Sequence, residues 1–310
     1  MNLPKQVTIV DVGPRDGFQM EPGFIPTEQK IKIIDRLSET GIKRIEATSF
    51  VHPKYVPQLA DAEEVLTSIK KKEGVIYEAL VPNAKGVERA IQAGVEHVSM
   101  VVSASESHNK TNVNMTVAES IKTLKEAVKL ALGNGIHVTA GIGTAFGCAF
   151  EKWVPPEKVE AVADEFLDMG ICELSLGDTP GLANPYQVSE MVRYYMQKLK
   201  GTDIGLRLHF HDSRGQGLAN VLAAILEGAT IIDTAICGLG GCPYSPGATG
   251  NIASGDTVNI LEAMGVDTGI DLEKLIECER MVQDILGKKL PGEVMKSGPI
   301  PWALKQPKSG

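Results

Sequence analysis

Short apolar runs rich in valine and isoleucine alternate along this chain with amphipathic stretches of helical period. Eight of the apolar runs predict strands, at 7–12, 44–50, 75–82, 97–104, 137–146, 172–179, 206–212 and 230–237. The intervening stretches predict helices, at 27–40, 56–71, 84–93, 116–134, 156–169, 185–198 and 216–227, with another near 254–264. Several of these helices end at a glycine just before the next strand, which is a frequent helix stop signal. This alternation indicates a parallel sheet covered by helices.

Eight strand–helix units fit the α/β class and its closed (β/α)8 barrel, the TIM barrel, which typically needs about 250 residues. A doubly wound open sheet is the alternative architecture. It usually has fewer strands and a phosphate loop after the first strand, and no G-x-G-x-x-G follows the first strand here. We therefore predict one catalytic barrel domain over residues 1–290, with an extra helix at 271–286. Residues 291–310 are rich in proline and lysine and are expected to form a loosely packed C-terminal tail.

The bulk composition limits the classes of partner. Hydrophobic residues make up 43% of the chain and charged residues 23%, which is ordinary for a globular protein and enough for a core. A net charge of −8 argues against nucleic acid as the main partner, although it leaves an anionic substrate open. No apolar run reaches the roughly 18 residues that span a bilayer, and no signal peptide is visible. We therefore expect no membrane partner, a cytoplasmic protein, and reduced thiols for its five cysteines, which lack C-x-x-C spacing.

Two histidines, His209 and His211, lie two residues apart inside an apolar run. Alternate side chains of a strand share a face, so this pair predicts half of a metal site at a strand end. An isolated His-x-His is more often a pair of core or surface histidines, but oxygen ligands occur in matching places. Asp16 follows the first strand, and Asn251 closes the glycine-rich run 238–251 that follows the last strand.

The functional residues of a TIM barrel collect at the carboxyl ends of its strands. Polar side chains in otherwise apolar strands are costly to bury unless they are paired or coordinated, yet nearly every predicted strand here ends in one. Those residues are Arg15, Asp16, Glu46, Thr48, Thr144, Ser175, Asp178, Thr179, His209, His211, Cys242 and Asn251.

The set Asp16, His209, His211 and Asn251 combines two imidazole nitrogens with hard oxygens. It suits a six-coordinate Mg²⁺ or Mn²⁺, with Zn²⁺ or Co²⁺ as alternatives, and a structural zinc site is disfavoured because closely spaced thiolates are missing. Arg15 beside such a cation could hold a developing enolate oxygen. Glu46 is expected to orient Arg15 as its buried partner rather than to react.

Six motifs in this chain resemble the HMG-CoA lyase family of the DRE-TIM metallolyases. They occur in order over about the first 290 residues: VGPRDG at 12–17, IEATSFV at 45–51, SASE at 103–106, LGDT at 176–179, HFHD at 209–212, and the loop at 242–251.

The resemblance implies the retro-aldol cleavage of 3-hydroxy-3-methylglutaryl-CoA to acetyl-CoA and acetoacetate, a reaction whose common setting is leucine degradation. It implies that Asp16, His209, His211 and Asn251 bind the divalent cation. Arg15 would stabilise the enolate, Cys242 would take part in proton transfer from a mobile lid, and Glu46 and Asp178 match acidic site positions. The resemblance places the stretch at 105–114 near the CoA moiety. Candidate substrate- and CoA-binding residues are Lys110, Asn112, Ser175 and Thr179. A homodimer or a higher homo-oligomer is left open.

The chain departs from the family pattern in a few places. Thr139 stands where an arginine is usual, Gly141 and Gly143 where bulkier residues are usual, and Gly255 where a glutamate is usual. The alternatives to an HMG-CoA lyase are therefore a lyase for a different 3-hydroxyacyl-CoA, a relative that condenses acetyl-CoA with a 2-oxo acid, and a ligand-binding barrel without activity. Intact metal ligands and Arg15 argue against the last of these.

Overall fold

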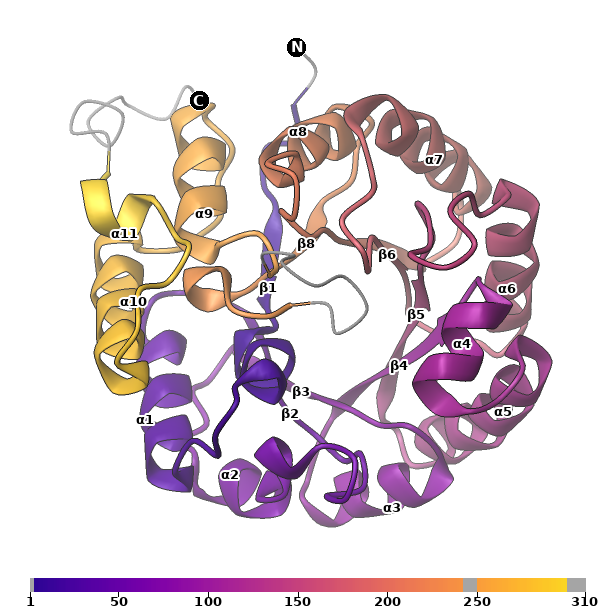
Figure 1. The fold of residues 1–310 in the computed structure, drawn as a ribbon, viewed down its shortest axis with the longest axis horizontal. Coiled ribbons are helices and arrows are strands. Elements are labelled where there is room, and N and C mark those ends of the chain that lie inside the picture. Colours follow the sequence, from indigo (N-terminus) through magenta and orange to yellow (C-terminus); the bar gives the residue numbers. More distant parts are fainter. Residues whose placement is uncertain (1–2, 242–249, 300–310) are drawn as a thin grey trace.

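The computed structural model describes residues 3–241 and 250–299, and it confirms the predicted closed barrel. Each strand pairs in parallel with the next, and β8 pairs with β1 to close the ring (Figure 1). The eight predicted strands are all present, and most of their ends are shorter than predicted. Their bounds are β1 Thr8–Asp11, β2 Arg44–Ser49, β3 Ile76–Leu80, β4 His97–Ser103, β5 His137–Gly143, β6 Glu173–Gly177, β7 Gly205–His209 and β8 Ile231–Thr234.

A ring of helices covers the outside of the barrel (Figure 1). The apolar faces of these helices and the outward faces of the strands form one continuous buried core. The helices that agree with the predicted ranges are α1 Thr27–Ser38, α3 Ala84–Gln92, α5 Val117–Gly133, α6 Pro156–Asp168, α7 Pro185–Lys198, α8 Gly217–Leu226, α9 Ser254–Ala263 and α10 Leu272–Leu286.

Two helical segments differ from the predictions. The expected helix at 56–71 is a 3₁₀ turn, Pro57–Leu59, followed by the short α2, Ala62–Ser68. A further helix, α4 Glu106–Val113, was not predicted because its sequence is polar throughout and shows no amphipathic period. Its ends explain it instead: the Ser105 side chain accepts a hydrogen bond from the N–H of His108, and Asn114 ends the helix in the left-handed conformation.

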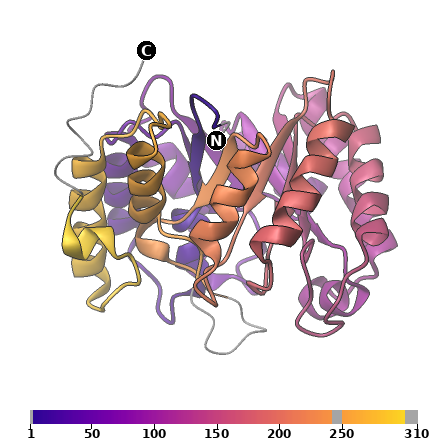
Figure 2. The ribbon, with the colours of Figure 1, turned by 90° about the horizontal axis from the view of Figure 1, so that it is seen from above.

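The C-terminal segment packs against the barrel. The extra helix α10 lies between α1 and α9, and α11 (Val294–Ser297) contacts both α9 and α10. Helices α9, α10 and α11 stand together on one side of the barrel (Figure 2). Met295 in α11 is buried. The loose tail expected from residue 291 onward is therefore wrong for its first residues, and residues 300–310 lie outside the described part of the chain.

No helix in the described ranges combines the length and the apolar character needed to cross a membrane.

Inside the barrel, below the carboxyl ends of the strands, lies a buried layer of ion pairs. Arg44 binds Glu78 (Nε to Oε1, 2.5 Å) and Glu173 (Nη2 to Oε2, 2.8 Å). Arg207 binds Glu78 (Nη1 to Oε2, 2.7 Å) and Asp233 (Nε to Oδ1, 2.5 Å). Buried charges of this kind are tolerated because each has partners on several strands.

Replacing Arg207 with leucine is expected to lower the free energy of unfolding by about 3–5 kcal/mol, because Glu78 and Asp233 would stay buried without their cation. Urea unfolding followed by circular dichroism measures this. Arg193→Leu is the control, since Arg193 pairs with Glu190 and Glu227 at the surface and should lose far less. Equal losses in the two variants would contradict the ion layer.

Candidate active site

The site begins with a single π-helical turn, Gly13–Gly17, that directly follows β1 and carries Arg15 and Asp16. The carboxylate of Asp11 holds the start of this turn by accepting the N–H of Gly13 at 2.8 Å. A Cβ at Gly13 would lie 2.8 Å from Cγ2 of Ile236, so the turn can approach the segment after β8 only because residue 13 is glycine. The turn thus places two charged side chains at the mouth of the barrel.

Arg15 is held between two carboxylates. Its Nε donates to Oε2 of Glu46 and its Nη1 donates to Oδ1 of Asp16, both at 2.5 Å. Glu46 is buried on β2, and its other oxygen accepts a hydrogen bond from the hydroxyl of Ser99. Burial acts to lower the pKa of Arg15, but the charges of Glu46 and Asp16 outweigh it and raise that pKa. The predicted pairing of Arg15 with Glu46 is present, and it leaves a permanently cationic guanidinium at the mouth.

Asp16, His209 and His211 bring their ligand atoms together, all within 4.8 Å of one another. The Nε2 atoms of the two histidines lie 3.2 Å apart. β7 ends at His209, and His211 lies beyond it. The prediction that one strand carries both histidines is therefore wrong for His211. His211 is placed instead by an isolated antiparallel bridge to Asn251, which is how the fourth predicted ligand reaches the group.

Asn251 completes the set. Its Nδ2 donates to Oδ2 of Asp16 at 2.7 Å and to the carbonyl of Leu239 at 3.0 Å. Its Oδ1 is buried and has no hydrogen-bond partner in the described structure. Burying this amide oxygen without a hydrogen bond costs free energy. The lone pairs of the two facing Nε2 atoms also repel unless a proton or a cation lies between them. A divalent cation would satisfy both, so the residues present fit the predicted metal site.

The electrostatics of Asp16 and His211 agree with this, whereas Asp233 favours the protonated form of His209. Burial opposes ionisation of Asp16, but Arg15 and the two histidines outweigh it and lower the pKa of Asp16 to about 2. Burial also disfavours the charged form of His209, yet the hydrogen bond and the charge of Asp233 raise its pKa. For His211, burial and then His209 lower the pKa to about 4, so this imidazole is neutral near pH 7. A carboxylate and a neutral imidazole are the protonation states that ligate a cation.

Asp178 follows β6 and binds the loop that leads to α7. Its Oδ1 accepts the N–H groups of Leu182 (2.8 Å) and Ala183 (3.1 Å), which shapes the loop between β6 and α7. Its Oδ2 is buried without a hydrogen-bond partner among the described residues. Burial raises the pKa of Asp178 to about 6 despite the two N–H donors. In this structure Asp178 positions a loop at the mouth.

The other predicted residues are spread over the mouth and its rim. Ser175 points into the barrel from β6, and Oγ1 of Thr179 accepts the N–H of Thr144 at 3.1 Å, joining the ends of β5 and β6. Lys110 and Asn112 are exposed on α4, the helix that follows β4. Cys242 lies outside the described residues.

Comparison with known proteins decides the family. The HMGL-like family model matches residues 6–282 of this chain. The chain belongs to the HMGL-like family. Hydroxymethylglutaryl-CoA lyase YngG of Bacillus subtilis is 45% identical to it over 300 residues, covering 96% of this chain and 100% of the relative.

Solved structures of HMG-CoA lyases match the fold closely. The Bacillus subtilis HMG-CoA lyase has a TM-score of 0.93 at 44% identity and covers 96% of this chain and 99% of its own. An HMG-CoA lyase from Acinetobacter baumannii, in complex with coenzyme A and 3-methylmalate, has a TM-score of 0.91 at 42% identity and covers 95% and 96%. The family resemblance carried by the six motifs is therefore confirmed.

Within the HMGL-like family, the departure at Thr139 has a structural location. Its hydroxyl donates to Oε2 of Glu173 at 2.9 Å and lies 2.7 Å from Nε2 of His97. Thr139 therefore belongs to the buried ion layer, beside Arg44 and below the mouth. A larger or charged side chain at residue 139 would therefore act on this ion layer first.

Asp233 is a site residue that the sequence reasoning missed. It accepts from Nε of Arg207 and lies 3.1 Å from Nδ1 of His209, so it orients that imidazole and links it to the ion layer. Its signal was an acidic residue inside the apolar run at 230–237. Gln19, whose Nε2 donates to Oδ1 of Asp16 at 3.0 Å, was missed as well and carries no comparable signal.

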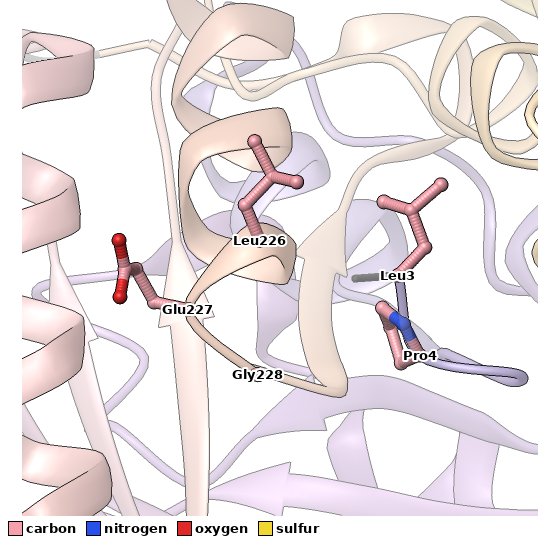
Figure 3. A pocket seen from close by; sticks show the side chains of 5 residues that line it. All are labelled: Leu3, Pro4, Leu226, Glu227 and Gly228. Carbon is pink, nitrogen blue, oxygen red and sulfur yellow. The ribbon is translucent and has the colours of Figure 1, made fainter. Parts of the chain in front are cut away.

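A depression at the opposite end of the molecule is separate from this site. It is lined by Leu3, Pro4, Leu226, Glu227 and Gly228, which precede β1 or connect α8 to β8 (Figure 3). These segments lie at the amino ends of the strands, the end of a TIM barrel that supports stability rather than catalysis. The chemistry is therefore assigned to the carboxyl ends.

Proposed function

We propose that this chain catalyses the divalent-metal-dependent retro-aldol cleavage of a 3-hydroxyacyl-CoA, with HMG-CoA as substrate and acetyl-CoA and acetoacetate as products. The observation that carries the proposal is the grouping of Asp16, His209, His211 and Asn251 next to the cationic Arg15. The Bacillus subtilis relative named above, an HMG-CoA lyase, matches nearly the whole chain, which supports the same reaction. We propose Mg²⁺ or Mn²⁺ as the cation, since oxygen and imidazole ligands suit both.

We assign cation binding, enolate stabilisation and proton donation to different residues of the site. Asp16, His209, His211 and Asn251 would hold the cation, which supplies Lewis-acid polarisation of the substrate's C3 hydroxyl and a neighbouring oxygen. A base takes the proton of the C3 hydroxyl, the C3 carbonyl forms, and the electron pair of the breaking C2–C3 bond becomes the enolate. Nε and Nη1 of Arg15 bind Glu46 and Asp16, so we assign Nη2 to the enolate oxygen. Cys242, in the loop before Asn251, remains the candidate donor of the proton that the enolate takes up.

The test is incubation of the purified full chain with HMG-CoA and Mg²⁺ or Mn²⁺, with mass-spectrometric detection of acetyl-CoA and acetoacetate. We expect cleavage that stops on chelation of the metal and returns when metal is added back. A parallel reaction with acetyl-CoA and a panel of 2-oxo acids tests the condensing alternative. Condensation without HMG-CoA cleavage would overturn the proposal.

A second candidate differs only in the acyl group, and the inner wall of the barrel favours it. On one row of the barrel wall, Val101 of β4 pairs with Gly141 of β5, which pairs with Ser175 of β6. Val101 is 49% exposed although it lies inside the barrel, so solvent reaches this wall. Gly141 and Gly143 contribute no side chains, and their neighbours across this wall are Val101, Ser175 and Thr179. This wall suits a 3-hydroxyacyl-CoA with a C3 substituent larger than methyl.

We expect Gly141→Val to lower kcat/KM for 3-hydroxy-3-alkylglutaryl-CoA esters with longer alkyl groups by at least tenfold, while HMG-CoA is affected less. The reason is that a Cβ at residue 141 would lie 3.2 Å from Cγ2 of Val101, so a valine there must displace Val101 and narrow this part of the wall. Gly133→Val on the exposed end of α5 is the control, because a Cβ there meets no atom within 4 Å. HMG-CoA as clearly the best substrate of the unaltered protein would rule out the second candidate.

A further inference from the structure

Two buried carboxylates hold successive peptide groups of the turn that follows β8. Asp11 accepts the N–H of Ile236 at 3.2 Å. Oε1 of Glu279 accepts the N–H of Cys237 at 3.2 Å and the N–H of Gly255 at 2.9 Å. Asp11 comes from β1, whereas Glu279 comes from α10, the helix added after the eight repeated units. Glu279 is fully buried.

Glu279 and Gly255 fit each other sterically. A Cβ at Gly255 would lie 2.5 Å from Oε2 of Glu279, a distance that real Cβ atoms essentially never show, and 3.0 Å from its Cδ. The carboxylate of Glu279 therefore stands where a side chain of residue 255 would begin. Residue 255 is also the position where the family resemblance leads one to expect a glutamate. In this chain the carboxylate at that place comes from α10 instead.

The turn held by Glu279 leads directly to the metal group. Cys237 has a φ of 60°, an unfavourable conformation for a residue with a side chain, so its N–H needs a fixed partner. Two residues later, the carbonyl of Leu239 accepts Nδ2 of Asn251, the same nitrogen that donates to Asp16. A Cβ on Gly17 would lie 2.6 Å from Cβ of Leu239, so this segment also packs directly on the turn that carries Asp16.

The cost of burying Glu279 indicates a role beyond filling space. Its Oε2 has no hydrogen-bond partner within the described residues, and burial raises the pKa of this carboxyl to about 7. Apolar side chains of similar volume fill such positions at a lower free-energy cost. Two N–H groups on different segments, however, can be tied together only by an acceptor.

We propose that Glu279 is a positioning residue for the reaction: from α10 it ties the turn after β8 to the start of α9, and thereby holds Asn251 against Asp16. Gly255 is the second half of this device, because only glycine admits the carboxylate. The expected change in kcat rests on the proposed function. The expected effect of Glu279 on the affinity for a divalent cation does not depend on which substrate is cleaved.

Four variants of the full chain test the proposal. Glu279→Leu removes the acceptor at similar volume. Glu279→Gln keeps an oxygen for both N–H groups. The double variant Gly255→Glu with Glu279→Ala returns a carboxylate to the same space from residue 255. Val282→Ala, at another buried position of α10, reports the effect of general destabilisation. Each is measured for Mn²⁺ affinity by electron paramagnetic resonance, for kcat and KM with HMG-CoA, and for unfolding in urea.

We expect Glu279→Leu to weaken Mn²⁺ binding by about 10–100-fold, the range for residues that orient metal ligands, and to lower kcat correspondingly. Glu279→Gln should bind Mn²⁺ within a few-fold of the unaltered chain, the double variant should regain most of the loss, and Val282→Ala should lose stability without losing Mn²⁺ affinity. Unchanged Mn²⁺ affinity in Glu279→Leu, with stability alone reduced, would overturn the proposal. If Glu279→Leu does not fold, the double variant decides, since failure to recover Mn²⁺ affinity there overturns it too. Altered Mn²⁺ affinity without any HMG-CoA cleavage would leave this proposal standing and contradict the proposed function.

Discussion

Turnover of HMG-CoA is expected to fall below detection in His209→Ala, while the variant still unfolds cooperatively. Removing this imidazole would delete one of the two nitrogen atoms that the proposed metal group offers to a cation beside Asp16. The fold should survive because His209 is partly exposed at the end of β7, whereas the strand's core contacts come from its neighbours Leu206 and Leu208. Steady-state kinetics with Mg²⁺ and Mn²⁺, together with Mn²⁺ binding, measure the effect.

His52→Ala provides the matched control for His209→Ala. His52 is exposed in the loop after β2 and bonds only locally, with Nδ1 accepting the N–H of Lys54. Its loss should change neither Mn²⁺ binding nor turnover. Full activity in His209→Ala would show that the metal group is wrongly assigned, whatever substrate the protein uses.

The second large effect is expected for Arg15→Lys, which should lower kcat by roughly 10²–10³-fold while KM changes little. Lysine keeps the charge but loses the planar fork that binds Glu46 and Asp16 through two nitrogens and leaves a third, Nη2, for the proposed enolate contact. An interaction that forms only as the enolate develops appears in kcat rather than in KM. Steady-state kinetics at saturating metal give both constants.

The comparison for Arg15→Lys is Lys30→Arg, which alters a cation of similar burial away from the site. Lys30 binds both carboxylate oxygens of Asp61 (2.7 and 2.9 Å), and this pair ties α1 to the segment before α2. We expect that variant to retain kcat. An Arg15→Lys enzyme with normal kcat, or one that loses activity only through KM, would contradict the role assigned to Arg15.

The architecture was predictable because it depends on periodicity. Eight apolar runs and the amphipathic stretches between them determine a parallel barrel almost without reference to tertiary contacts. The prediction was wrong where structure depends on other signals. The polar helix α4 is formed by its capping residues, and α2 is shortened near Pro57. The packing of α11 on α9 and α10 has no local signature at all.

The candidate site was predictable to the extent that strand ends converge. That rule brought Arg15, Asp16 and His209 together correctly, although His211 is placed by a bridge to Asn251 and not by the strand. The supporting residues could not be found in the same way. Whether Asp233 faces His209 depends on the register of β7 against β8. The contact between Glu279 and Gly255 joins segments that no periodicity relates.

The position of α10 also sets the smallest portion of this chain that could work alone. A fragment cut after α9 would retain all eight strands and every candidate metal ligand, yet it would leave the backbone at Cys237 and Gly255 without an acceptor. Chimeras that exchange barrel units between relatives face the same limit, because residue 255 and residue 279 must be inherited from one parent. The eight strand–helix units therefore complete the barrel, but the smallest part of the chain expected to be active also includes α10.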